Sequence, residues 1–202
     1  MVYDMNDKME VMNGGKALMK ALEKEGVKEV FGLPGGANLP MYDELYKSNI
    51  RHILVRHEQS AAHMADGFGR VSRKPGVCFA TSGPGATNLL TGIATAQADS
   101  APMVAVTGQV PVNMIGRDAF QESDIIGMSN PCVKYAFQPR TPQEIPEAVK
   151  KGFYIAETGR PGPVLLDIPK DVQQNEAEIT FPNEVRIPGY HPWTDVDITN
   201  IE

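Results

Sequence analysis

One glutamate and two glycine-rich segments have the residue types and spacing that binding or catalysis would need. Glu58 lies between an expected strand at 51–56 (RHILVR) and a helical pattern at 58–73, so its carboxylate is expected where a strand passes into a helix. The segments 33–38 (LPGGAN) and 82–88 (SGPGATN) also follow apolar runs. Ligands of parallel sheets bind beyond the carboxyl ends of the strands, where such junctions lie. By itself, however, Glu58 is better explained as a helix-start acid that interacts favourably with the helix dipole.

The glycine-rich segments do not have the patterns of phosphate-binding loops. Neither fits GxGxxG or GxxxxGK[ST]. Pro84 lacks an amide proton, which disfavours a phosphate cradle and makes a flat organic ring the easier ligand. His57 and His63 have no serine or cysteine neighbour to activate, and Cys78 and Cys132 have no partner at metal-ligand spacing. The sequence therefore gives no support for a catalytic triad, a cysteine nucleophile or a zinc site.

The elements that must carry these residues alternate between strands and helices. Apolar residues recur at helical spacing between short, largely apolar runs, a pattern typical of a parallel sheet covered by helices. The run 76–81 has no polar face, so both of its sides must be buried. We therefore expect an α/β fold, an open parallel sheet with helices on both faces in flavodoxin-like layers. The expected helices are 13–25, 39–47, 58–73, 86–97 and 142–157, and the expected strands are 29–32, 51–56, 76–81, 103–107, 133–137 and 163–168.

Composition and charge exclude several classes of protein. With 202 residues, 42% of them hydrophobic, the chain can bury one sizeable core without disulfides. Its formal net charge of −6 gives no basic footprint for nucleic acid or for an anionic membrane surface. The charge-free stretch 75–98 is too rich in glycine, proline and polar residues to cross a bilayer. The first residues do not resemble a signal peptide, so we expect a cytoplasmic protein that binds neither nucleic acid nor membrane.

The chain is expected to contain one domain with an extension at each end. Residues 1–12 are interpreted as an N-terminal tail, and the alternating elements place the domain at 13–172. After Pro169 the periodicity disappears and the composition becomes polar, with several prolines. Residues 173–202 are therefore expected to form an extended linker toward a further domain.

Six motifs occur in one order and resemble those of a known family. They are PGG, RHEQSAAHMADGFGR, TSGPGATN, GQVP, DAFQE and GRPGPVLLDIPKDV. Together they resemble the pyrimidine-binding domain of thiamine-diphosphate-dependent enzymes, and within these the catalytic subunit of acetolactate (acetohydroxyacid) synthase. The resemblance covers residues 14–172. It implies a transferase that condenses two 2-ketoacids, pyruvate with pyruvate or with 2-ketobutyrate, with loss of CO₂ in branched-chain amino-acid biosynthesis.

The resemblance assigns Glu58 a role that has a physical reason. In this family the matching glutamate hydrogen-bonds N1′ of the cofactor's aminopyrimidine and stabilises the imino tautomer, whose nitrogen then removes the proton from thiazolium C2. The same match places Pro84 and Asn88 against the aminopyrimidine, and Gly35, Gly36 and Gln121 near the reacting centre. It makes Arg160 a cofactor-binding residue, as in the synthases that carry FAD.

The resemblance also implies a substrate channel, lined by Pro111, Ala119, Phe120 and Lys170. Two of these residues have alternative explanations: Phe120 could be a core aromatic, and Lys170 could be a solvated lysine.

Two departures from the family pattern limit what the chain is expected to do alone. Leu33 stands where many of these enzymes have an aromatic residue before PGG, so stacking on the cofactor differs. The chain also has no GDG followed by an asparagine, the family motif that holds Mg²⁺ and diphosphate in a separate domain. We therefore expect half of an active site, inactive alone and completed by the diphosphate-binding domain of a partner subunit in a homodimer or larger homo-oligomer. The chain would then be a truncated or separately encoded part of the enzyme.

Several alternatives stay open at this point. A subunit of another thiamine-diphosphate 2-ketoacid decarboxylase, such as sulfopyruvate decarboxylase, also carries this domain as a separate chain, although GQVP and DAFQE count against it. A non-catalytic interaction module of the same fold is the alternative from another class, and the intact Glu58 segment counts against that. The sequence leaves open the choice between pyruvate and 2-ketobutyrate as acceptor, the retention of FAD, and the binding of a regulatory subunit.

Overall fold

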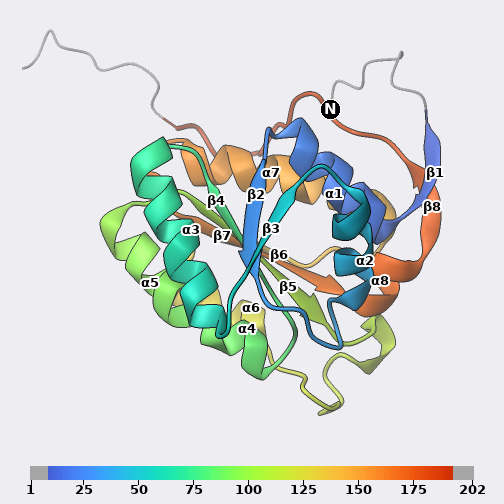
Figure 1. Cartoon of the computed structure of the whole chain (residues 1–202). Helices are drawn as coiled ribbons and strands as arrows, with labels where there is room; N and C mark the ends of the chain where they lie inside the picture. The colour runs from blue at the N-terminus through green and yellow to red at the C-terminus, as the bar shows by residue number, and fades with distance from the viewer. Residues whose placement is uncertain (1–8, 193–202) are drawn as a thin grey trace, which may run out of the picture.

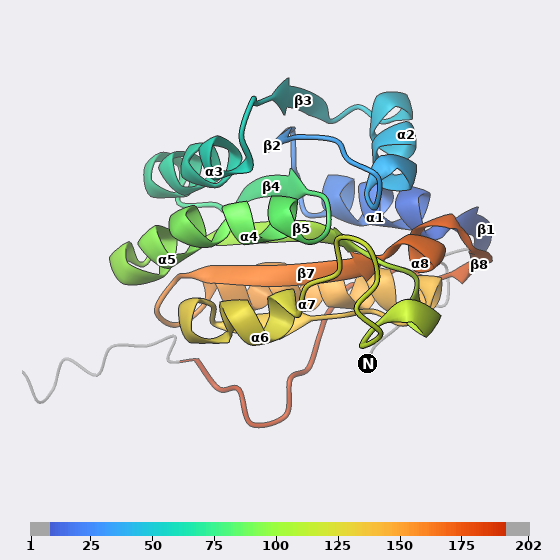
Figure 2. The same ribbon diagram turned by 90° about the horizontal axis from the view of Figure 1, so that it is seen from below.

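A six-stranded parallel sheet forms the centre of the protein. The structure, a computed structural model, describes residues 9–192, and its main sheet has the strand order β3-β2-β4-β5-β7-β6 (Figure 1). Every neighbouring pair in this sheet is parallel, and helices lie on both of its faces (Figure 2), so the expected α/β class is confirmed. The strands of the sheet are β2 (Glu29–Gly32), β3 (Arg51–Leu54), β4 (Gly76–Ala80), β5 (Met103–Gln109), β6 (Tyr135–Phe137) and β7 (Pro163–Pro169).

The helices lie close to the positions that the sequence predicts. The helix expected at 86–97 consists of two helices that meet at Leu89, and the one expected at 142–157 begins with a 3-10 turn. None of the helices described is long and apolar enough to cross a membrane. The helices are α1 (Gly14–Lys24), α2 (Leu39–Lys47), α3 (Glu58–Ser72), α4 (Pro84–Asn88), α5 (Leu90–Asp99), α6 (Ile125–Ser129), α7 (Ile145–Glu157) and α8 (Lys170–Gln174), with 3-10 turns at Val112–Met114, Asn130–Cys132 and Pro142–Glu144.

Alternate residues of the central strands enter two different cores. Val77 and Phe79 of β4 pack with α1, α2 and α7, whereas Cys78 and Ala80 pack with α3 and α5. Successive side chains of a strand point to opposite faces, so a strand buried on both sides needs apolar residues at every position. This explains the apolar run at 76–81.

The chain after Pro169 differs from the extended segment that the sequence predicts. It forms the short helix α8 and then a strand, β8 (Glu176–Ile179), which pairs antiparallel with β1 (Glu10–Asn13). A single helical turn and a mostly exposed two-stranded sheet bury too few side chains to produce a visible period. Regular structure therefore extends beyond both expected domain limits, 13 and 172. The remaining parts of the expected tail and linker, 1–8 and 193–202, lie outside the described residues.

The contact between α3 and the start of β4 has no room for a side chain. A Cβ on Gly76 would lie 2.0 Å from the carbonyl oxygen of Ala65, whereas a Cβ on Gly67 in the same helix would meet nothing within 4 Å. We expect Gly76→Ala to lower the free energy of unfolding by about 1–3 kcal/mol, because backbone must move to accommodate the methyl group. Gly67→Ala is the matched control and should raise the free energy of unfolding by up to about 1 kcal/mol, because alanine has the higher helix propensity. Urea unfolding measures the free energy of unfolding of both variants, and equal effects of the two substitutions would contradict this account.

Candidate active site

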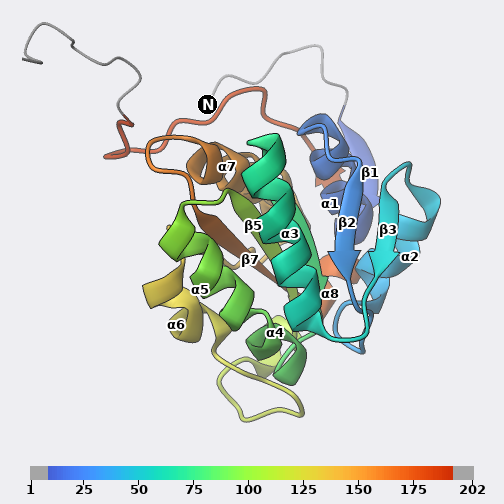
Figure 3. The same ribbon diagram turned by 60° about the vertical axis from the view of Figure 1, so that its left-hand side comes forward.

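The segments that carry the expected site residues meet at one edge of the sheet. The loops after β2, β4 and β5 leave the carboxyl ends of parallel strands, and α8 begins where β7 ends. Figure 3 shows α4 and the long loop after β5 at this end of the molecule. The strands therefore place these loops side by side, as the fold class predicts.

Glu58 is the first residue of α3 and is largely buried, with 8% of its surface exposed. The side chain of His57 caps this helix by accepting a hydrogen bond from the amide of Gln59 at 3.1 Å. Asn88 donates a hydrogen bond from Nδ2 to Oε2 of Glu58 at 2.9 Å, and among the described residues it is the only donor to this carboxylate. Oε1 faces Gly85, where an added Cβ would lie 3.2 Å away. The same Cβ would lie 2.7 Å from Thr81 Cγ2, so this close approach requires glycine.

The PGG segment packs against the end of β4. A Cβ on Gly35 would lie 2.6 Å from Thr81, so this approach requires glycine. The amide of Ala37 donates to Thr81 Oγ1 at 3.1 Å, and the amide of Gly35 donates to Asn38 Oδ1 at 2.7 Å. Thr81 is thus a further residue of the site, which the sequence analysis did not single out. Its only signal was its place between an apolar run and a glycine-rich segment.

A pocket of about 260 Å³ lies beside these loops. Phe120 on its wall is 88% exposed, so the alternative of a core aromatic is wrong. Lys170 lies on the pocket wall as well, at the start of α8. The pocket brings together six of the expected residues, Gly36, Pro111, Ala119, Phe120, Gln121 and Lys170, with Ala37, Ser82, Gln109, Val110 and Met114.

One turn of chain separates Glu58 from the pocket. Gly85 contacts the Glu58 carboxylate, while Gly83, two residues earlier, contacts the backbone of Gln121, where an added Cβ would lie 2.4 Å from the carbonyl oxygen. Gly83 has a φ of +55° and Gln121 a φ of +56°. The TSGPG segment therefore forms a wall with the buried carboxylate on one side and the pocket on the other. The Pro84 expected in this site is the first residue of α4, between the two glycines.

A buried polar network lies under the pocket. Asp167 in β7 accepts hydrogen bonds from Thr107 Oγ1 at 2.7 Å, from Gln109 Nε2 at 3.1 Å and from Gln138 Nε2 at 2.7 Å. Burial raises the pKa of Asp167 to about 6, against the opposing effect of these three donors. The sequence analysis missed Asp167, although an acid inside the apolar run PVLLDIP was a visible signal.

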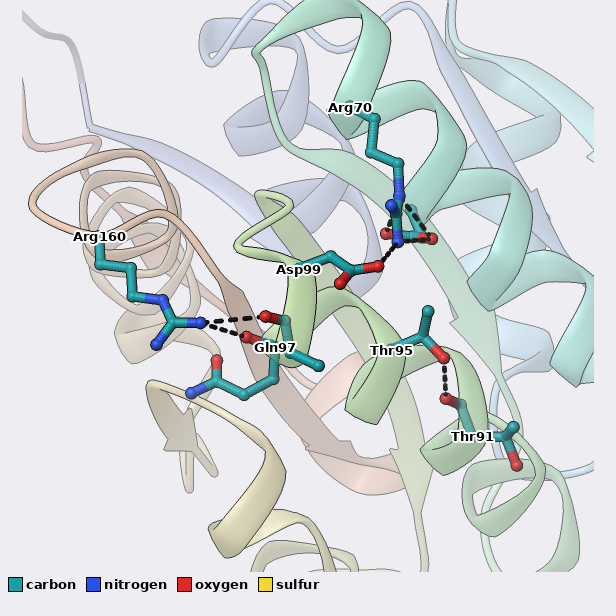
Figure 4. A network of polar contacts seen from close by, with 8 residues as sticks. Arg70, Thr91, Thr95, Gln97, Asp99 and Arg160 are labelled. Carbon is teal, nitrogen blue, oxygen red and sulfur yellow. Dashed lines mark hydrogen bonds and ion pairs between the residues drawn. The ribbon is translucent and has the colours of Figure 1, made fainter.

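Arg160 lies away from the other candidate residues. Its side chain donates hydrogen bonds to the carbonyl oxygens of Ala98 and Gln97 at 3.0 and 3.3 Å, at the C-terminal end of α5 (Figure 4). It also donates to Ser100 Oγ at 2.7 Å. It precedes β7, so it lies near the amino ends of the strands. The structure therefore does not bring Arg160 together with Glu58, and its role toward FAD stays a prediction.

Comparison with known proteins agrees with this geometry. Residues 12–128 match the model of the thiamine pyrophosphate enzyme, N-terminal TPP binding domain. The chain belongs to this family. This chain is 60% identical over 186 residues to a probable acetolactate synthase large subunit of Methanocaldococcus jannaschii. The aligned region covers 91% of this chain and 32% of that protein. The chain is 53% identical over 194 residues to the acetolactate synthase large subunit of Corynebacterium glutamicum, covering 96% of this chain and 31% of that protein.

The chain spans about a third of the length of these curated relatives. The resemblance read from the six motifs is confirmed, and the relatives favour acetolactate synthase over a sulfopyruvate decarboxylase subunit.

The residues at the edge of this TPP binding domain fit thiamine diphosphate, because Glu58 presents a nearly buried acceptor oxygen beside a space that a side chain on Gly85 would fill.

The buried Asp167 makes stability depend on pH in a predictable direction. Its folded pKa of about 6 lies above the ordinary aspartate value of 3.8, so the folded state binds more protons between these values and stability falls as the pH rises through that window. Asp167→Asn removes this loss. We expect the stability of the Asn variant relative to wild type to rise by up to about 3 kcal/mol between pH 4 and pH 7.

Thermal unfolding at several pH values measures this difference. Asp66→Asn is the matched control, because it removes a buried carboxylate that is paired with Arg70 and should show no such gain. A constant offset between wild type and Asp167→Asn at every pH would contradict the prediction.

Proposed function

We propose that this chain is the pyrimidine-binding domain of an acetolactate synthase, a transferase that condenses two 2-ketoacids with loss of CO₂ in branched-chain amino-acid biosynthesis. The observation that carries the proposal is the buried Glu58 carboxylate, held by Asn88 and separated by one glycine-rich turn from a pocket of about 260 Å³. Relatives that are 60% and 53% identical and are named acetolactate synthase large subunits support it.

Glu58 would hold the aminopyrimidine of thiamine diphosphate through a hydrogen bond to a ring nitrogen. When bound, the cofactor would supply a nucleophilic carbon for the keto carbonyl of the substrate and a cationic ring that takes up the electron pair released with CO₂. Glu58 would share a proton with the ring nitrogen, and the bond from Asn88 to Oε2 keeps the carboxylate in one orientation. Its low exposure strengthens the interaction, because little water competes for the carboxylate.

The pocket would hold the 2-ketoacid. Lys170 on its wall provides a positive charge for the substrate carboxylate, and Phe120 and Pro111 provide apolar surface for the alkyl group. The pocket lies on the far side of the TSGPG wall from Glu58, so its lining can select a substrate without touching the carboxylate. We propose that the acceptor is chosen here.

The remaining parts of the enzyme are proposals that rest on the family. Within residues 9–192 no group of three or more histidine, cysteine, aspartate or glutamate side chains could hold a metal ion. Mg²⁺ and the diphosphate would be held by the diphosphate-binding domain of a partner subunit in a homodimer, and the exposed Phe120 offers apolar surface for such a contact. FAD in the whole enzyme, a regulatory subunit and a cytoplasmic location stay predictions.

The decisive experiment replaces the matching N-terminal third of the Methanocaldococcus jannaschii protein with this chain. We expect the chimera to form acetolactate from pyruvate, and Glu58→Gln to lower its turnover by about two orders of magnitude, because the amide cannot share a proton as the carboxylate does. Asp66→Asn is the control for loss of a buried carboxylate from the same helix. Normal turnover of the Glu58→Gln chimera would remove Glu58 from the mechanism, and a wild-type chimera without activity would favour a non-catalytic module.

The exposed aromatic ring on the pocket wall should affect selectivity and not folding. We expect Phe120→Ala to change the ratio of kcat/KM for 2-ketobutyrate and pyruvate by about threefold or more. It should change the free energy of unfolding by less than about 0.5 kcal/mol, because the side chain is 88% exposed. Tyr46→Ala is the matched control, since Tyr46 is 93% exposed and lies outside the pocket. Loss of stability with unchanged kinetics would contradict the placement of Phe120.

A further inference from the structure

Three neighbouring strands bring polar side chains to one level beneath the pocket. Thr107 of β5 and Asp167 of β7 are partners in the parallel register, and Gln109 lies two residues after Thr107 on the same face of β5. Gln138 follows β6 directly. Thr107, Gln109 and Asp167 are all buried, in a region where the neighbouring residues of both strands are apolar. Burial of such polar groups costs stability unless they are hydrogen-bonded.

Both oxygens of Asp167 are used. Oδ1 accepts from the hydroxyl of Thr107, and Oδ2 accepts from the side-chain amides of Gln109 and Gln138. A carboxylate has the acceptor capacity for all three donors. An apolar side chain here would take away an acceptor from all three donors, of which Thr107 and Gln109 are buried.

Gln109 transmits this constraint to the pocket. Its Nε2 donates both to Asp167 and to the carbonyl oxygen of Ser123 at 2.9 Å, and its Oε1 accepts from the amide of Val110 at 2.9 Å. Turning the amide over would place Nε2 against the amide of Val110 and Oε1 against two acceptors. The carboxylate therefore holds the Gln109 side chain in one orientation.

Ser123 belongs to the segment that carries Phe120 and Gln121. The Glu122 carboxylate ties this segment together, because it accepts from the amides of Gly116 and of Ala119, the latter at 2.8 Å. Gln121 in turn contacts Gly83 in the TSGPG wall. A shift of Ser123 would therefore move the pocket wall as a unit.

We propose that Asp167 is a positioning residue that, through Gln109, fixes the segment 119–123 and so sets the size of 2-ketoacid that the pocket accepts. The selectivity part of this inference rests on the proposed function. Asp167 does not touch the substrate, since it is fully buried beneath Gln109, which itself lines the pocket.

The first test measures hydrogen exchange of the backbone amides of 110–123 in the chain itself. We expect Asp167→Leu to speed exchange of the Ala119 and Val110 amides about tenfold, because Gln109 loses one of the two acceptors that hold its side-chain amide. Asp167→Asn should restore slow exchange to within about threefold, because its carbonyl oxygen can accept from both glutamines while its amide donates to Thr107.

Two further variants keep this test decisive if Asp167→Leu does not fold. Gln109→Met keeps the length of the side chain and leaves Asp167 in place, and it should loosen the same amides. Thr107→Val removes only the donor to Oδ1 and should leave them slow. Slow exchange in Gln109→Met, or equal loosening in Thr107→Val, would overturn the positioning role.

The second test uses the chimera with the Methanocaldococcus jannaschii protein. Asp167→Leu should raise kcat/KM for 2-ketobutyrate relative to pyruvate about fivefold or more, and Asp167→Asn and Thr107→Val should keep the wild-type ratio. An unchanged ratio in Asp167→Leu would overturn the selectivity part. A wild-type chimera without activity would instead overturn the proposed function, while the exchange data would still decide whether Asp167 positions the segment.

Discussion

The parallel register of β2, β4, β5 and β7 is the constraint on which the candidate site depends. Parallel strands end at the same edge, so loops that are far apart in the chain become neighbours without any direct attraction between them. This edge receives the PGG segment, the TSGPG wall, the segment with Phe120 and the start of α8. The helices on both faces make the arrangement rigid, because each central strand is buried on both sides.

Close approach of backbone explains why glycine recurs at this edge. Gly35 and Gly85 lie against Thr81, and Gly83 lies against Gln121, so a side chain at any of these positions would collide with its neighbour. The TSGPG wall is therefore thin. The buried carboxylate and the pocket therefore both lie close to one short segment. In the proposed function, this segment separates proton transfer from selection of the substrate.

Two buried acids at this edge differ in what surrounds them. Among the described residues, Glu58 accepts one hydrogen bond, from Asn88 to Oε2, and Oε1 accepts none, whereas Asp167 uses both oxygens on three donors. A carboxylate with an unused acceptor suits chemistry on a ligand, and one whose acceptors are occupied suits the fixing of neighbouring side chains. Burial raises the pKa of Asp167, so this support is held at a cost in stability at neutral pH.

The sequence by itself determined the α/β class, the approximate bounds of the main elements and the family, because periodicity and ordered motifs are local properties of the chain. It also placed Glu58 at the start of a helix. Only the tertiary structure decided that Asn88 binds Glu58, that Phe120 is exposed, and that α8 and β8 continue the domain. The network of Asp167 depends on the register between β5 and β7. It also depends on Ser123, which lies 44 residues before Asp167 in the chain and is joined to it through Gln109. Such pairings are long-range, so no local pattern of residue types reveals them.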